Sequence, residues 1–371
     1  MENGADIALR AIQEIHTLWQ IDPDGAQWIG NGTPEGIQRD GYGFEWWPGD
    51  FKVTARVYGP NPEASETAYR LNVRTDFLSG INVADPEFLN KLSPLNRICP
   101  SFSICTVPMD VSEMAGEDPK SSDAWLASTG YVHAGIIEWF PKFFGGQAIL
   151  QIIEAQFRAD AAIQQIGGRP NCLDVVRSPP DDTLDGMLGV EEETFIPEGQ
   201  GSSRWSNNGE FERIIEKWGR TETTFGNVDG SGLTLEVSFG DDSAILLFFA
   251  DEPHPHLGSG LLSVVQLPYS LGQNEASAQA NKLNFWEAQM WTNARVPFVG
   301  NWSSIEFSEN QYCVAHTSFI PNLLFQPGLA ENAALWGISR VRCVRETWYP
   351  DLVDVPMYEI LEKRFKQNET Q

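Results

Sequence analysis

The chain has few cysteines, few basic residues and no long apolar run, and each shortage excludes a class of protein. Its five cysteines are scattered through 371 residues with no C-x-x-C spacing, which argues against a disulfide framework or a zinc site. No apolar run approaches the roughly 18 residues of a membrane span, so we expect no membrane partner. The first residues carry acids where a secretory signal carries bases, which predicts a cytoplasmic protein.

Basic residues are outnumbered: 25 lysines and arginines stand against 51 aspartates and glutamates, for a formal net charge of -26. Such a chain repels phosphate backbones at long range, so nucleic acid is not an expected partner. Acidity also keeps a protein soluble, and this explanation needs no partner at all. The alternative is that the acidic surface attracts basic partners.

Sequence motifs of catalysis and of cofactor binding are missing as well. The chain has no G-x-S-x-G, no P-loop, no H-E-x-x-H and no G-x-G-x-x-G that opens a helix. We therefore predict no catalytic residue, no cofactor and no enzymatic activity. His254 and His256, in the segment DEPHPH, are weak candidates for metal ligands; their place at an expected hairpin turn favours solvated turn residues instead.

What the sequence does contain is a repeat. NKL occurs at 90–92 and again at 281–283, and at this offset the segments that begin at Gly49 and Gly240 align without a gap. Helical periodicity predicts a helix at 5–19 in the first half and at 211–218 in the second. Period-two alternation then predicts strands at 51–58 and 69–77, matched by 243–250 and 260–267.

Each half continues with a short helix, two more strands and a long helix that follows an aromatic-X-Pro signal. We therefore predict an α+β fold of two tandem copies of one module, each with antiparallel strands in the order helix, three strands, helix, two strands, helix. The modules are expected at 1–166 and 209–350. An acidic linker containing glycine and proline is predicted at 167–208, and a tail helix at 351–371.

In the order and length of these elements, and in NKL after the third strand, the chain resembles the type III secretion chaperone-like fold, the class that also contains the YbjN-like bacterial proteins. The resemblance covers about 5–166 and 209–350. It implies a bacterial binding module, with a covalent pseudo-dimer in place of the family's usual homodimer.

Strand alternation places four cations on one face of the first sheet. If Val53, Ala55 and Val57 face the helices, the residues between them face away, and the next strand follows the same rule. The outward cations are Lys52, Arg56, Arg70 and Arg74. At the same offset the second copy has Ser243, Leu247, Leu261 and Val265, so its outer face is expected to be mostly apolar.

We expect the four cations to bind either a polypeptide partner or the protein's own acidic linker, and the apolar face to pack on the other copy or on an apolar peptide. The alternative is a solvated set of charges and an ordinary internal interface. Trp46 and Trp47 are adjacent in a strand-like segment and face opposite sides, so at least one needs a ligand or a cover, for which the loop at 22–43 is the expected element.

Together these features predict a non-catalytic, chaperone-like or adaptor protein that binds a polypeptide. One alternative is a small-molecule- or metal-binding protein, or an enzyme, that uses a cleft between the copies and the turn with the two histidines. Another is a structural protein whose pseudo-dimer builds larger assemblies.

Overall fold

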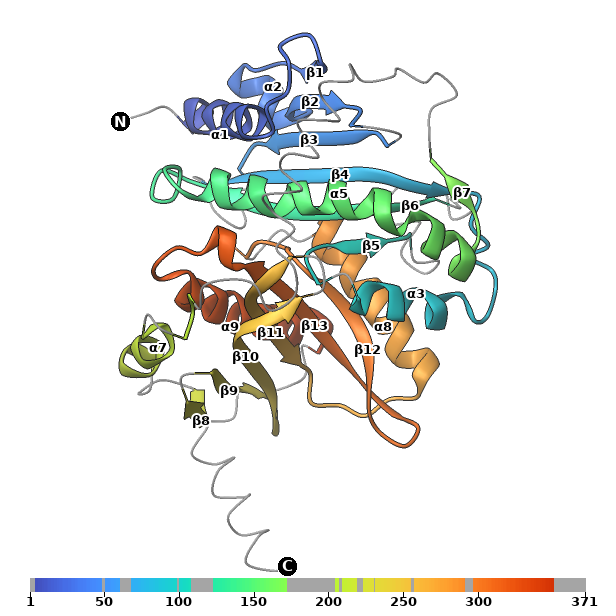
Figure 1. Ribbon diagram of the computed structural model, residues 1–371, viewed down its shortest axis with the longest axis vertical. Coiled ribbons are helices and arrows are strands. Elements are labelled where there is room, and N and C mark those ends of the chain that lie inside the picture. The colour runs from blue at the N-terminus through green and yellow to red at the C-terminus, as the bar shows by residue number, and fades with distance from the viewer. Residues whose placement is uncertain are drawn as a thin grey trace, which may run out of the picture. The chain divides into compact units, whose positions relative to one another are not determined.

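A computed structural model describes residues 4–48, 51–60, 68–98, 100–107, 123–171, 204–206, 209–218, 223–229, 231–254, 257–290 and 296–349. Helices and antiparallel sheets give the predicted α+β fold (Figure 1). The chain divides into two compact units. Unit 1 comprises Met1–Glu193 with Gln273–Ser304, and unit 2 comprises Thr194–Gly272 with Ile305–Gln371.

Unit 1 contains a seven-stranded sheet with the order β1-β2-β3-β4-β6-β5, in which β7 also pairs with β4. The strands are β1 (Ala26–Gly30), β2 (Tyr42–Trp46), β3 (Val53–Tyr58), β4 (Tyr69–Ser79), β5 (Ser103–Cys105), β6 (Ala124–Val132) and β7 (Arg169–Pro170). The helices are α1 (Gly4–Leu18), α2 (Pro34–Arg39), α3 (Phe88–Arg97), α5 (Phe140–Ile166), α8 (Gln273–Phe285) and the π-helix η1 (Trp286–Met290).

Unit 2 is built on a six-stranded sheet with the order β12-β13-β11-β10-β9-β8. The strands are β8 (Thr223–Asp229), β9 (Gly232–Phe239), β10 (Asp242–His254), β11 (Gly258–Gln266), β12 (Asn301–Ser308) and β13 (Gln311–Pro321). The helices are α7 (Glu210–Trp218), the 3-10 helix η2 (Asn322–Leu324) and α9 (Leu329–Trp348). The first residues of β12 belong to unit 1.

The two sheets have the same strand order. Read from β8, the second sheet runs β8-β9-β10-β11-β13-β12, which matches β1-β2-β3-β4-β6-β5 strand by strand. Two features before the middle helix differ from the sequence prediction: four strands, not three, come before this helix in each copy, and the first copy has the additional short helix α2 between β1 and β2. In the first copy β1 lies in the predicted loop at 22–43, and its burial shows no period of two that a pattern search could find.

The core of unit 1 lies between the sheet and helices α1 and α5, which pack on each other and on β3 and β6 (Figure 1). Val53, Ala55 and Val57 are fully buried and the residues between them are half-buried, which confirms the predicted alternation. Gly130 on β6 allows α5 to approach closely, because a Cβ there would lie 2.9 Å from the ring of Phe140. Because α1 and α5 pack on this inner face, the opposite, outer face of the sheet is available for other contacts.

Helix α8 and the chain after it contact the outer face of this sheet. The rings of Trp125 and Phe285 lie 6.2 Å apart, and Thr129 and Phe298 exchange backbone hydrogen bonds of 2.9 and 2.6 Å. These contacts make residues 273–304, from the second half of the sequence, part of unit 1. The compact units are therefore a different division of the chain from the sequential modules at 1–166 and 209–350.

The repeated NKL lies in α3 and α8, and these two helices pack together. Each helix also carries an asparagine whose side-chain amide forms two hydrogen bonds with the backbone of one later residue in the same copy. Asn96 accepts from the N–H of Ile104 at 2.7 Å and donates to its carbonyl at 3.1 Å. Asn284 does the same to Trp302, at 2.7 and 2.8 Å. Both copies thus fix the middle helix to the following strand with the same side-chain amide.

The predicted linker is described only near its two ends. Arg169–Pro170 pair with Ser79 and Leu78 of β4, and residues 204–206 are described within unit 2. Most of the linker and the predicted tail helix lie outside the described residues. Within the described ranges, no helix has the length and apolar character needed to cross a membrane.

Candidate anion-binding face

The four predicted cations lie on the outer face of the unit 1 sheet. In the ladder between β3 and β4, Arg56 stands opposite Asn72, while Thr54 pairs with Arg74 and Tyr58 with Arg70. Arg70 and Arg74 are therefore two residues to either side of Asn72, so both are diagonal neighbours of Arg56. We call Lys52, Arg56, Arg70 and Arg74 the cationic face.

A hollow of about 350 Å³ opens on this face over β2, β3 and β4. It is lined by Glu45, Thr54, Arg56, Tyr58, Arg70, Asn72 and Arg74. Gly43, the β2 residue paired with Arg56, contributes no side chain to fill it. The lining thus contains three guanidinium groups and one carboxylate in a chain whose net charge is -26.

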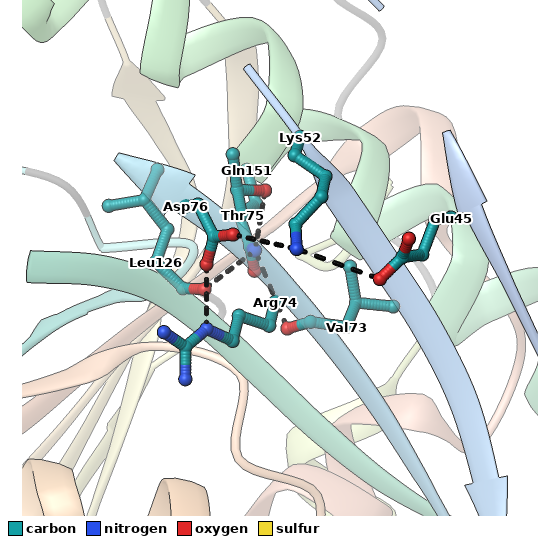
Figure 2. A network of polar contacts seen from close by, with 8 residues as sticks. All are labelled: Glu45, Lys52, Val73, Arg74, Thr75, Asp76, Leu126 and Gln151. Carbon is teal, nitrogen blue, oxygen red and sulfur yellow. Dashed lines mark hydrogen bonds and ion pairs between the residues drawn. The ribbon is translucent and has the colours of Figure 1, made fainter. Parts of the chain in front are cut away.

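One end of the cationic face is a chain of ion pairs (Figure 2). Lys52 Nζ lies 3.6 Å from Glu45 and 3.3 Å from Asp76, and Arg74 Nε donates to Asp76 at 2.8 Å. Two cations and two carboxylates therefore neutralise one another here. Because the pairs are partly exposed, each stabilises the fold by no more than about 1 kcal/mol. Their main effect is to fix the direction of the Arg74 side chain.

Arg74 is also held by an aromatic ring. Its guanidinium carbon lies 4.5 Å from the ring centroid of Trp125 on β6, within the range of a cation–π contact. Cys105 on β5 pairs with Trp125 and is fully buried. Burial raises the pKa of the Cys105 thiol to about 12, although the Ser103 hydroxyl and Arg74 oppose the shift. Cys105 is therefore a neutral thiol near pH 7 and not a nucleophile.

Arg70 is held from the other side. Its guanidinium donates to the carbonyl of Ala288 in η1, and Asn72 donates to the same oxygen at 3.4 Å. The Arg70 guanidinium also lies 5.9 Å from the ring centroid of Tyr58. These contacts orient Arg70 before any ligand arrives, so it loses less side-chain entropy when it binds an anion.

Arg56 differs from Arg70 and Arg74 because its guanidinium forms no hydrogen bond and no ion pair with a described residue. Its Nε is buried and has no acceptor among these residues. A buried donor without an acceptor costs about 1–3 kcal/mol of stability. A charged donor retained at that cost, in a hollow flanked by two oriented arginines, is the main feature of this site.

The strands under the site are fixed from the inner face by Gln151 of α5 (Figure 2). Its Nε2 donates to the hydroxyl of Thr75 and to the carbonyl of Leu126, both at 3.0 Å, and its Oε1 accepts from Ser128 at 2.8 Å. Gln151 thereby ties β4 to β6 beneath the hollow. We did not anticipate this residue, although a lone glutamine in the apolar run AILQII was a usable signal.

The two predicted tryptophans lie away from the hollow. Trp46 is buried on the inner face, and its ring stacks at 5.8 Å on Trp19, which follows α1, so Trp19 supplies the cover expected from the loop at 22–43. Trp47 follows the end of β2 and is half-buried. Neither tryptophan lines the hollow on the cationic face.

The outer face of the unit 2 sheet is mostly apolar, but two of the four residues predicted to lie on it were wrong. Leu247 is half-buried between the inward Leu246 and Phe248, as expected, and Ser243 is buried. Leu261 and Val265 lie instead on the inner face: they are buried, and Val265 pairs with Leu246, near Gly337 of α9.

The reason for this error is a shift of one residue in the ladder. β10 has a bulge between Phe249 and Glu252, where its pairing with β11 changes register. Such a shift moves every following side chain to the opposite face of the sheet. The half-buried outer residues of β11 are therefore Leu262, Val264 and Gln266. Gln266, not Val265, takes the place of Arg74.

The same bulge carries Asp251, which fixes residues 204–206, near the C-terminal end of the predicted linker. Its carboxylate accepts the backbone N–H groups of 204–206 and the hydroxyl of Ser206, the last at 2.6 Å. Burial alone would raise the pKa of Asp251, but these hydrogen bonds lower it below its usual value. Asp251 also has a positive φ of 54°, a conformation uncommon outside glycine. Sequence reasoning missed this anchor.

Of the two weak candidates for metal ligands, His254 and His256, the structure describes only His254. His254 is buried, accepts the N–H of Leu257 at 3.2 Å and packs 5.0 Å from the ring of Phe319. His256 lies outside the described residues. Among the residues that are described, no three His, Cys, Asp or Glu side chains come together as metal ligands would.

Comparisons with known proteins identified no relative of this chain. The resemblance to type III secretion chaperone-like modules therefore stays a prediction from the element order. No family model matches the chain, and neither a curated protein nor a solved structure matches it.

Proposed function

We propose that this protein is a non-catalytic binding protein that holds a polypeptide segment by an anionic group seated in the hollow of the cationic face. The observation that carries the proposal is the lining: three arginines surround one hollow, and Arg56 has a buried donor without an acceptor in the described chain. Arginine forks suit oxyanions because they donate two parallel hydrogen bonds.

The arrangement of the sheet also suits a polypeptide. The hollow lies over three neighbouring strands, so a segment can run across the face with one side chain inserted and its backbone outside. A volume of about 350 Å³ accepts one side-chain head and not a length of chain. The rest of the acidic surface repels polyanions at long range, so recognition depends on contacts inside the hollow.

A second candidate is a small anionic molecule in the same hollow. Its volume is at the lower end of the range of about 300–1,000 Å³ that small-ligand pockets occupy. This candidate uses the same arginines and differs in having no contacts beyond the hollow. A free anion would then bind as tightly as the same anion carried on a peptide.

The test is fluorescence anisotropy with a labelled, glycine- and serine-rich peptide that has a central Glu-Glu pair. We expect saturable binding that weakens as salt rises, and no binding of the matching Gln-Gln peptide. Arg56→Gln should weaken binding at least about 10-fold, since a hydrogen bond to a charged group contributes about 1.5–3 kcal/mol.

The matched control is Arg39→Gln. Arg39 is exposed, pairs with Asp40 at 2.7 Å and does not line the hollow, so its loss should leave the affinity unchanged. Equal affinity of the wild type and Arg56→Gln for the Glu-Glu peptide would contradict the proposal.

A further inference from the structure

We propose that the hollow selects a phosphate monoester, a tetrahedral dianion, over a carboxylate. This inference rests on the proposed function, because it names the anionic group that the cationic face would hold. It concerns the same three arginines and is argued from their number, their geometry and the neutral groups around them.

The first argument is charge. Three guanidinium groups and one carboxylate line the hollow, so the lining itself has an excess of two positive charges. Glu45, the lining carboxylate, is within 3.6 Å of Lys52, which lies outside the lining. A phosphate monoester carries close to two negative charges at pH 7 and balances that excess, whereas one carboxylate balances half of it.

The second argument is geometry. Arg56 is opposite Asn72, and Arg70 and Arg74 stand two residues to either side of Asn72, so three guanidinium groups line one hollow from neighbouring positions. A carboxylate offers two oxygens in one plane, which matches a single arginine fork. A phosphate monoester offers three terminal oxygens pointing apart, so it can accept hydrogen bonds from more than one guanidinium group at once.

The third argument is the set of neutral groups in the lining. Thr54 and Tyr58 place two hydroxyls beside the arginines, while the amide of Asn72 donates to Ala288 and Thr129. Hydroxyl groups donate to phosphate oxygens that the guanidinium groups leave exposed. Among the described residues the lining contains arginine but no lysine, and arginine suits the recognition of phosphate by paired hydrogen bonds.

The experiment compares two peptides of equal charge and one peptide without that charge. One peptide has a central phosphoserine, the second the Glu-Glu pair and the third an unmodified serine. At pH 7.5 the first two both carry about two negative charges, so a difference in affinity reports the tetrahedral group and not the charge. We expect the phosphoserine peptide to bind at least about 10-fold more tightly than the Glu-Glu peptide. Arg56→Gln should remove that preference, and Arg39→Gln should keep it.

A second variant, Arg56→Lys, tests the inference if Arg56→Gln fails to fold. Arg56→Lys keeps the charge but loses the fork, so it should keep weak binding and lose most of the preference for phosphoserine. Thermal unfolding of each variant reports whether the fold is intact. If Arg56→Gln unfolds, Arg56→Lys decides the question alone: an unchanged preference there overturns the inference.

A pH series gives an independent readout. Between pH 5.5 and 7.5 a phosphate monoester loses its second proton, with a pKa near 6, and gains charge. Its affinity should therefore rise severalfold with pH. The titratable groups that face the hollow or adjoin it are Glu45 on β2, Tyr58 on β3, Asp76 on β4 and Cys105 on β5, with Lys52 ahead of β3. The Glu-Glu peptide, measured over the same range, reports any contribution from these protein groups.

The outcomes separate the two proposals. Equal affinity for the phosphoserine and Glu-Glu peptides overturns this inference and leaves the proposed function standing. Binding of phenyl phosphate as tight as that of the phosphoserine peptide, with no binding of the Glu-Glu peptide, supports the phosphate site and overturns the polypeptide function. No binding of any phosphorylated probe overturns the inference, and if the Glu-Glu peptide also fails, both proposals fall.

Discussion

The two sheets share one strand order and differ in what their outer faces present. At matched ladder positions the first sheet has Arg56 and Arg70 where the second has Leu247 and Leu262. The inner faces keep their alternation of buried residues, because the helices must pack against them. The outer faces do not pack against these helices, so they are the part of a duplicated module that is free to acquire a binding role.

One of the polar differences between the inner faces lies opposite Val73 in the first sheet and Val265 in the second. In the first sheet Val73 pairs with Ser128, which donates to Gln151 of α5. In the second sheet Val265 pairs with His316, so His316 takes the place of Ser128. His316 is fully buried, and burial lowers its pKa well below the usual value, with Arg340 of α9 adding to the effect. At the matched strand position, unit 1 has Ser128 bonded to the amide of Gln151, and unit 2 has a buried histidine whose neutral form is favoured.

The largest expected effect comes from a substitution on the inner face of unit 1. Gln151→Ala removes the partner of two buried hydroxyls and leaves a cavity between α5 and the sheet. We expect the free energy of unfolding to fall by about 3–4 kcal/mol, from lost hydrogen bonds plus the cavity. Urea denaturation measures it. The control is Gln156→Ala on the same helix, where one half-buried hydrogen bond to Pro48 is lost and the cost should be about 1 kcal/mol.

Exchanging the outer faces should give the next largest effect. Arg56→Leu places the unit 2 residue in unit 1 and should weaken peptide binding at least about 10-fold. Its stability should stay the same or rise, because a buried donor without an acceptor is removed. The reciprocal Leu247→Arg should create no binding, since Leu262 and Gln266 provide no neighbouring guanidinium. Loss of both binding and stability in Arg56→Leu would indicate a structural role instead.

A smaller effect should appear with pH in unit 2. The folded pKa of His316 is below its unfolded value of about 6.5, so the unfolded chain takes up a proton first as pH falls. The contribution to stability is therefore complete above about pH 6.5 and declines below it, by at most about 1.4 kcal/mol per pH unit. His316→Gln should flatten this dependence between pH 7 and 5.5 in urea denaturation. An unchanged slope would mean that His316 is not the responsible group.

The smallest effect concerns the ion pairs at one end of the cationic face. Lys52→Met removes the contacts with Glu45 and Asp76 but leaves the lining of the hollow intact. We expect a loss of less than about 1 kcal/mol in stability and no more than about a threefold change in peptide affinity. A larger loss of affinity would extend the binding site beyond the three arginines.

Much of the fold could be predicted because alternation and helical periodicity are local properties. The strand residues of β3 and β4 alternate cleanly, and the same pattern placed Arg56, Arg70 and Arg74 on one face. The bulge at Asp251 could not be predicted, since it depends on how two strands pair, and it caused the error at Leu261 and Val265. The contact of Ala288 with Arg70 was also beyond prediction, because it joins residues 218 positions apart.

The measurement that tests the central claim most directly is photo-crosslinking of the Glu-Glu peptide, with a photoreactive residue beside the pair, followed by mass spectrometry. The account predicts crosslinks to β2, β3 and β4 around the hollow, lost in Arg56→Gln and retained in Arg39→Gln. Crosslinks elsewhere in the chain, or crosslinks at the hollow that Arg56→Gln leaves unchanged, would contradict it.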